Sequence, residues 1–107
     1  MVRLTDLTTT QDIIHACGSH APSVAVALVV QDFYGGDILR CSLLKGGVYY
    51  YNTLPTGEIV DLATREDTPV KAHSRVRERA TILRNPDMVK AYATLLVEVV
   101  QRMRGDE

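Results

Sequence analysis

The stretch that most restricts the fold is an uninterrupted run of apolar residues from 24 to 30, with the sequence VAVALVV. Seven apolar residues are too few to cross the hydrocarbon core of a bilayer, so the run has to be covered by protein. Pro22 precedes it and Gly35-Gly36 follow it, and these residues favour the first turn and the end of a helix. The whole segment is longer than a usual strand. We therefore predict a helix that is buried on most of its faces in the middle of the molecule.

After residue 36 the pattern changes to short apolar segments separated by turns that contain glycine. Three such segments follow one another: 37–44 (DILRCSLL), 48–54 (VYYYNTL) and 58–62 (EIVDL). Segments of this length and composition are typical of strands. In the second segment, Tyr49 and Tyr51 share one face and Tyr50 takes the other. Because the turns are short, we predict an antiparallel meander of three strands.

The remaining segments predict helices at both ends of the chain. Residues 8–16 favour a short helix closed by Gly18, and Asn85-Pro86-Asp87 is a strong helix start. Between them we expect a loop over residues 64–73 and one or two helical turns within the charged stretch 75–84. The predicted fold is α+β and forms a single domain over residues 1–107: the central apolar helix packs on the three-stranded sheet, and an amphipathic C-terminal helix covers another flank.

Charge and cysteine content narrow the functional classes. The chain has 12 Lys and Arg against 13 Asp and Glu, a formal net charge of -1 at pH 7. This balance excludes a global electrostatic attraction to nucleic acid or to an anionic membrane. The two cysteines, Cys17 and Cys41, are too few for a disulfide framework, so we expect free thiols. With no apolar signal-peptide core near its start, the chain is expected in the cytoplasm, where the C-terminal helix offers a surface for a homodimer.

Three segments taken in order resemble the small bacterial proteins of the YunG type: ALVVQDFYGGDILR, YYYNTLPTGEIVDLATRE and LRNPDMVKAYATLL. The resemblance extends from Gly18 to Leu96, and the order and spacing of the first two segments are its most specific feature. YunG-type proteins are similar to papain-like and transglutaminase-like folds, in which a cysteine at the start of a buried helix faces a histidine on the following strands. The resemblance thus implies a papain-like core with a cleft at the start of the apolar helix.

Two residues depart from the pattern of that family. When the segment ALVVQD is aligned with the family pattern, Ser23 stands where the family has its cysteine. When Asn52 is aligned with the asparagine of the pattern, Tyr49 stands where the family has its histidine. The acidic position of the E-I-D-L segment is retained as Asp61. A serine hydroxyl needs a general base more than a thiol does, and a phenol with an ordinary pKa near 10 is a poor base at neutral pH. The resemblance therefore implies a catalytically degenerate protein that uses the former active-site cleft for binding.

The expected occupant of this cleft is a small molecule or a peptide, and the protein would serve as an accessory or partner of an enzyme. We expect no cofactor, no metal, no membrane association and no nucleic acid. The candidate residues are Ser23, Tyr49 and Asp61 at the former catalytic positions and Tyr51, Tyr34 and Asp32 for binding.

Catalysis with altered residues is the alternative. Ser23 would then be the nucleophile, His20 the base and Asp61 the orienting carboxylate of an amide or ester hydrolase or an acyltransferase. An acid–base isomerase or cyclase would instead need Tyr49 and Asp61 to converge on one pocket.

Purely structural interpretations exist for the same residues. Ser23 beside a proline fits a helix cap, and Asp61 can pair with Arg40 or Arg65. The cluster HACGSH, residues 15–20, offers three potential zinc ligands but lacks a fourth. The basic stretch from Lys71 to Arg84 could hold an anion, but without interleaved aromatic residues it is more typical of a solvated surface.

Overall fold

The computed structural model describes residues 7–65 and 67–105. Its elements, in chain order, are α1 (Leu7–Cys17), a short 3-10 helix η1 (Gly18–His20), α2 (Ser23–Tyr34), β1 (Asp37–Leu43), β2 (Val48–Thr53), β3 (Ile59–Val60), β4 (Pro69–Arg77), α3 (Arg79–Ile82) and α4 (Pro86–Gly105). The fold is α+β. No helix in the described part of the chain combines the length and the apolar character needed to cross a bilayer. The first six residues, where the sequence predicts no signal peptide, lie outside the described residues.

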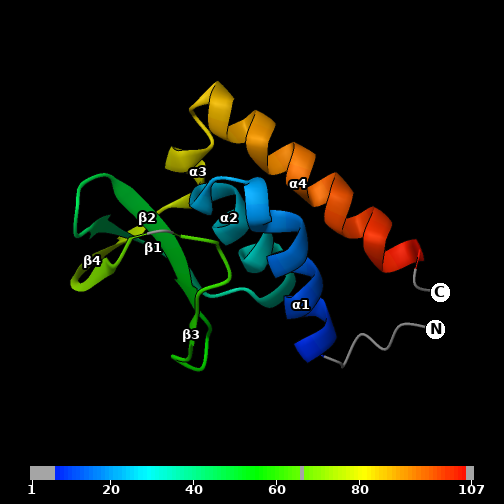
Figure 1. The fold of residues 1–107 in the computed structure, drawn as a ribbon, viewed down its shortest axis with the longest axis horizontal. Helices are drawn as coiled ribbons and strands as arrows, with labels where there is room; N and C mark the ends of the chain where they lie inside the picture. The colour runs from blue at the N-terminus through cyan, green and yellow to red at the C-terminus, as the bar shows by residue number, and fades with distance from the viewer. Residues whose placement is uncertain (1–6, 66, 106–107) are drawn as a thin grey trace.

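The predicted central helix is confirmed as α2. All seven residues from Val24 to Val30 are buried. In Figure 1, α2 lies between the sheet on one side and α1 and α4 on the other, which explains why no face of the run is polar. Gly35 and Gly36 end the helix with φ angles of 74° and 79°, a region that residues with a side chain rarely adopt.

The sheet is antiparallel, and the prediction of three strands was wrong because the structure has four, in the order β3-β2-β1-β4. The additional strand β4 occupies much of the expected loop and the beginning of the stretch where we expected helical turns. Its residues carry several charges and little alternation, as is common for an edge strand. It forms because β1 offers it a partner, with Leu39 opposite Val76 and Arg40 opposite Arg75.

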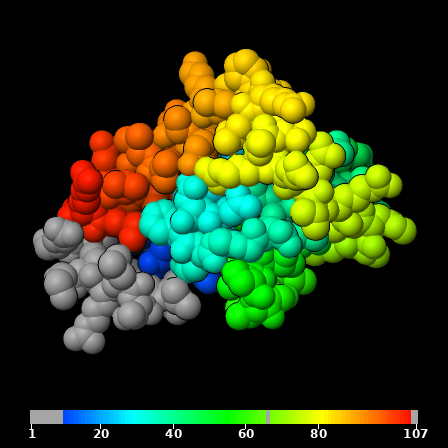
Figure 2. All heavy atoms as spheres, turned by 180° about the vertical axis from the view of Figure 1, so that it is seen from behind, coloured from blue at the N-terminus to red at the C-terminus, as the bar shows by residue number. Residues whose placement is uncertain are grey.

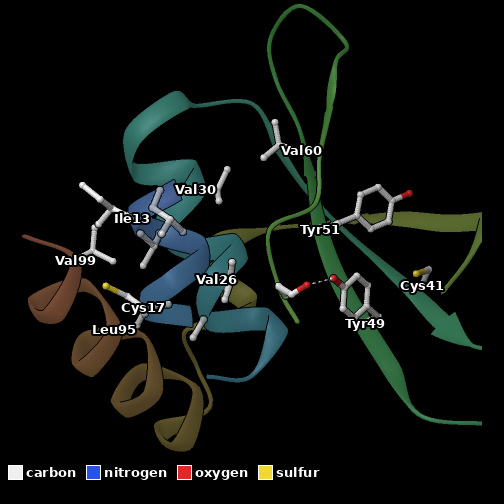
Figure 3. Packing of buried hydrophobic residues seen from close by; sticks show 14 residues of the cluster. Ile13, Cys17, Val26, Val30, Cys41, Tyr49, Tyr51, Val60, Leu95 and Val99 are labelled. Carbon is white, nitrogen blue, oxygen red and sulfur yellow. Dashed lines mark hydrogen bonds between the residues drawn. The ribbon is translucent and has the colours of Figure 1, made fainter. Parts of the chain in front are cut away.

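The two faces of the sheet pack against different parts of the molecule. Tyr50 and Ile38 belong to one buried cluster with α2 and α3 residues, and the amide of the fully buried Asn52 donates a 2.9 Å hydrogen bond to the Ala27 carbonyl of α2. Tyr49 and Tyr51 project from the opposite face of β2, as Figure 3 shows. They are only 3% and 4% exposed because the segment after β3 and part of β4 cover them.

The C-terminal helix α4 begins where the sequence predicts it. The side-chain oxygen of Asn85 accepts the N–H of Asp87 at 2.9 Å, which satisfies one of the free donors at the helix start. Leu95 and Val99 of α4 are buried with Ile13 and Cys17 of α1 (Figure 3). Seen from behind, α4 and the residues around α3 form one band from red to yellow, and β4, in yellow-green, lies at the rim of the molecule (Figure 2).

Candidate functional site

The side chains of Tyr49 and Asp61 are hydrogen bonded, although neither the strand pattern nor the turns of the sequence require it. The Tyr49 hydroxyl donates its proton to Asp61 Oδ1. The Ala63 carbonyl oxygen lies 3.0 Å from the same hydroxyl, the contact that Figure 3 marks with a dashed line. Strand β3 ends at Val60, so Asp61 leaves the sheet and turns toward β2. Positions 49 and 61 are two of the three that the resemblance places at the former catalytic site, and the structure has these two side chains in contact.

Asp61 is also the centre of a small ion-pair network. Its Oδ2 atom lies 3.1 Å from Arg65 Nη1 and 2.8 Å from Lys71 Nζ, and its side chain is only 12% exposed. The pairing with Arg65 is one of the two that the sequence suggests, whereas Lys71 comes from β4, which the sequence did not predict. Two cations facing one carboxylate give this network a net charge of +1.

Tyr51 extends the network along β2. Its hydroxyl lies 2.5 Å from Ser74 Oγ, and Ser74 donates to the Lys71 carbonyl at 2.7 Å. Because the single hydroxyl proton of Ser74 is used in that bond, Tyr51 is the donor to Ser74. The ammonium of Lys71 also lies over the Tyr51 ring, 4.9 Å from its centroid. Lys71 and Ser74 are the site residues that sequence reasoning missed, and their positions depend on the irregular pairing of β4 with β1.

Ser23 is the first residue of α2, and it does not cap the helix as the structural interpretation supposed. Pro22 occupies the cap position, and the Ser23 hydroxyl accepts a 3.0 Å hydrogen bond from the backbone N–H of Tyr50. Strand β3 pairs only with Asn52 and Thr53, so this part of the β2 edge lacks a neighbouring strand. Ser23 thus supplies the hydrogen-bond acceptor that no strand provides for the Tyr50 N–H. This contact holds the start of α2 against β2 one residue away from Tyr49.

A pocket of about 490 Å³ adjoins the Tyr49–Asp61 pair. Ala63 and Arg65, which contact Tyr49, are among its lining residues, together with His15 and Asp67. Nδ1 of His15 lies 2.6 Å from the Leu62 carbonyl oxygen, which holds the ring at the pocket edge. We call this hollow the Arg65 pocket. Tyr49 and Tyr51 are themselves buried, so a ligand would meet the site at this pocket and not at their side chains.

His20 lies on a different hollow, of about 430 Å³, between η1 and α4. Cys17, Leu95, Lys90 and Glu98 are among its other lining residues. Within residues 7–65 and 67–105, no hydrogen bond joins His20 to Ser23. Both cysteines are free and buried, and burial raises the pKa of each thiol. No group of three or more His, Cys, Asp or Glu residues in the described ranges is arranged to hold a metal ion.

Asp32 and Tyr34, two candidates for binding, are held in structural contacts away from Tyr49. Asp32 Oδ1 pairs with Arg79 at 2.8 Å, and its other oxygen accepts the hydroxyl proton of Tyr92 at 2.5 Å. Arg79 also donates to the Leu28 carbonyl and so joins α2, α3 and α4. Tyr34 packs against the main buried cluster. The sequence did not predict the Arg79 contacts, which depend on how α3 and α4 fold back over α2.

The proton of Tyr49 makes stability depend on pH in the alkaline range. Burial and the neighbouring carboxylate of Asp61 raise the pKa of Tyr49 far above its ordinary value of about 10. The unfolded chain therefore ionises first, so this contribution to stability is complete below about pH 10 and is lost as pH rises beyond it. We expect the free energy of unfolding of Tyr49→Phe, measured by urea titration at several alkaline pH values, to fall less steeply than that of the wild type. Equal slopes would contradict this assignment.

The comparisons with known proteins identify a family for this chain. No curated protein and no solved structure is detectably similar to the chain. A family model described as YunG protein matches residues 18–104, which include α2, the whole sheet and nearly all of α4. The chain therefore belongs to the YunG family.

Proposed function

We propose that this YunG-family protein is a catalytically degenerate relative of papain-like proteins, in which Ser23 and Tyr49 stand at the former cysteine and histidine positions. The protein binds a small molecule or a peptide at the Arg65 pocket and acts as an accessory or partner of an enzyme. The observation that carries the proposal is the hydrogen bond in which Tyr49 donates its proton to Asp61.

That hydrogen bond disfavours catalysis because a general base must be free to accept a proton. Tyr49 is a donor to Asp61, and its raised pKa keeps it protonated at neutral pH. Asp61 itself is committed to Tyr49, Arg65 and Lys71. Neither group is available to remove a proton from Ser23.

Ser23 has a structural role that accounts for its presence without chemistry. Its hydroxyl is the acceptor for the N–H of Tyr50, and a buried backbone donor left unsatisfied costs about 1–3 kcal/mol. The alternative base, His20, lies on the hollow against α4 and is not hydrogen bonded to Ser23 in the described part of the chain. The contacts thus favour binding over the alternative of an altered hydrolase.

The Arg65 pocket has the composition of a binding site for a polar ligand. The side chain of Arg65 is 38% exposed, so part of its guanidinium remains accessible while Nη1 holds Asp61. A guanidinium offers five donors, so it can serve Asp61 and a ligand carbonyl or carboxylate at once. His15 and the backbone around Ala63 provide further polar groups at the same hollow.

The absence of catalysis is tested with p-nitrophenyl acetate and a fluorophosphonate that labels activated serines. We expect Ser23→Ala to hydrolyse the ester at the rate of the wild type, and mass spectrometry to find no label on Ser23. A large loss of hydrolysis in Ser23→Ala, or labelling of Ser23, would establish the altered hydrolase instead.

The binding role is tested by saturation-transfer NMR with a pool of N-acetyl amino acids and short peptides. We expect signals for a subset of the pool with the wild type and Ser23→Ala, and their loss in Arg65→Ala. Arg84→Ala is the matched control, since Arg84 is exposed and lies outside this pocket. A pool that binds Arg65→Ala and the wild type equally would overturn the assignment of the ligand to the Arg65 pocket.

A further inference from the structure

A second group of cations lies on the other face of the sheet, away from Tyr49 and Tyr51. Arg40 of β1 and Arg75 of β4 are direct cross-strand partners, and Arg77 follows two residues later, opposite Ile38. Alternation along the strands puts these three arginines on the same face as Tyr50. Together with His73 they line a hollow of about 150 Å³. We call Arg40, His73, Arg75 and Arg77 the arginine face.

No member of the arginine face has an ion-pair partner among the described residues. The ion pairs in residues 7–65 and 67–105 use Arg65, Lys71 and Arg79, and none uses a member of the arginine face. No Asp or Glu of these ranges lines the hollow. The chain as a whole has a net charge of -1, so this concentration of positive charge does not follow from a generally basic composition.

Two features of the arginine face destabilise the folded protein when no anion is bound there. Like charges directly opposite each other on neighbouring strands repel, and Arg40 and Arg75 stand in that relation. In addition, Arg77 Nε is buried and has no hydrogen-bond partner in the described structure. A buried donor without an acceptor is destabilising. An oxyanion in the hollow would reduce the repulsion and bring acceptors to the guanidinium groups.

We propose that the arginine face binds a single phosphate group. Guanidinium groups recognise phosphate oxygens through paired, charge-assisted hydrogen bonds, and three arginines line this hollow. The hollow is of a size for one tetrahedral oxyanion and lacks room for a nucleoside. No aromatic side chain in the described ranges lines it, so it has no surface on which a base could stack. Figure 2 shows β4 at the rim of the molecule, where a phosphate carried by a larger molecule can also reach it.

The test is the binding of inorganic phosphate to the full chain, measured by isothermal titration calorimetry and by thermal unfolding. We expect phosphate to raise the melting temperature of the wild type, and Arg75→Gln to weaken phosphate binding by at least about tenfold. Without phosphate, Arg75→Gln should melt at the same temperature as the wild type or higher, because the repulsion with Arg40 is removed. Arg84→Gln, a matched change of an exposed arginine outside the hollow, should behave as the wild type.

The ligand's source and the competing explanations are distinguished by the choice of probe. Phosphoserine binding more tightly than inorganic phosphate would identify a phosphomonoester as the ligand, and the reverse would identify the free ion. Sodium chloride at matched ionic strength should not reproduce the stabilisation. Equal stabilisation by chloride, equal phosphate binding by Arg75→Gln and the wild type, or binding of oligothymidylate without binding of phosphate would each overturn the proposal.

Discussion

Gly36→Ala is expected to destabilise the protein by more than about 3 kcal/mol, which places it among the most damaging single changes that a small domain tolerates. Gly36 has a φ of 79°, and a Cβ atom built on it would lie 2.1 Å from the Thr53 carbonyl oxygen and 2.9 Å from Leu54 Cα. Both atoms belong to the backbone at the end of β2, so no side chain can move aside. The two backbone segments would have to move apart at the point where β1 begins and β2 ends.

Gly46→Ala is the control that separates backbone strain from collision. Gly46 has a φ of 114°, but a Cβ atom there would meet no heavy atom within 4 Å. We expect a cost of about 1–3 kcal/mol, the amount that an unfavourable backbone conformation alone carries. Urea unfolding of both variants gives the comparison. If the two glycines proved equally costly, the close approach of Gly36 to β2 would not contribute to stability.

Gly36 illustrates which parts of the fold can be predicted from the sequence. The paired glycines after a long apolar run predict the end of α2, and Asn85-Pro86 predicts the start of α4, because the signals for these boundaries are local. Strands β1 and β2 are predictable for the same reason, since their apolar residues lie between glycine turns. The sequence does not predict that Gly36 contacts Thr53, although that contact is what makes glycine necessary there.

Strand β4 could not be predicted, because its stability comes from a distant partner. Its apolar residues Val70 and Val76 are separated by a charged and irregular stretch, and Val76 is 60% exposed. Such a segment forms a strand only when an existing edge, here that of β1, accepts its hydrogen bonds. The irregular register between Arg40 and Ser42 then decides where Lys71 and Ser74 lie.

The residues of the candidate site also fall into those that the sequence identifies and those that depend on long-range packing. The contact of Tyr49 with Asp61 and the pairing of Asp61 with Arg65 involve residues that the sequence singles out within the β2–β3 region. Lys71 and Ser74 depend on β4, and the contacts of Arg79 with Asp32 depend on the return of α3 and α4 over α2. Local sequence signals therefore identify the centre of the site, and only the long-range packing identifies the residues around it.

The assignment of positions 23 and 49 to former catalytic roles can be tested by restoring the missing groups. We expect the double variant Ser23→Cys with Tyr49→His to react with iodoacetamide near pH 6 at least about tenfold faster than Ser23→Cys alone. A thiol at the start of α2 benefits from the positive end of the helix, and an imidazole beside Asp61 would be held as the cation that stabilises a thiolate. In Ser23→Cys alone, Tyr49 supplies no such cation.

The background in this experiment is low, because Cys17 and Cys41 are buried and burial raises their pKa values. Peptide mapping by mass spectrometry assigns the label to Cys17, Cys41 or the new thiol, and circular dichroism checks that each variant is folded. A folded double variant that reacts no faster than Ser23→Cys would show that an imidazole at position 49 does not activate a thiol at position 23. The resemblance to papain-like proteins would then lose its chemical basis, because the defining property of that site is that its two groups act on each other.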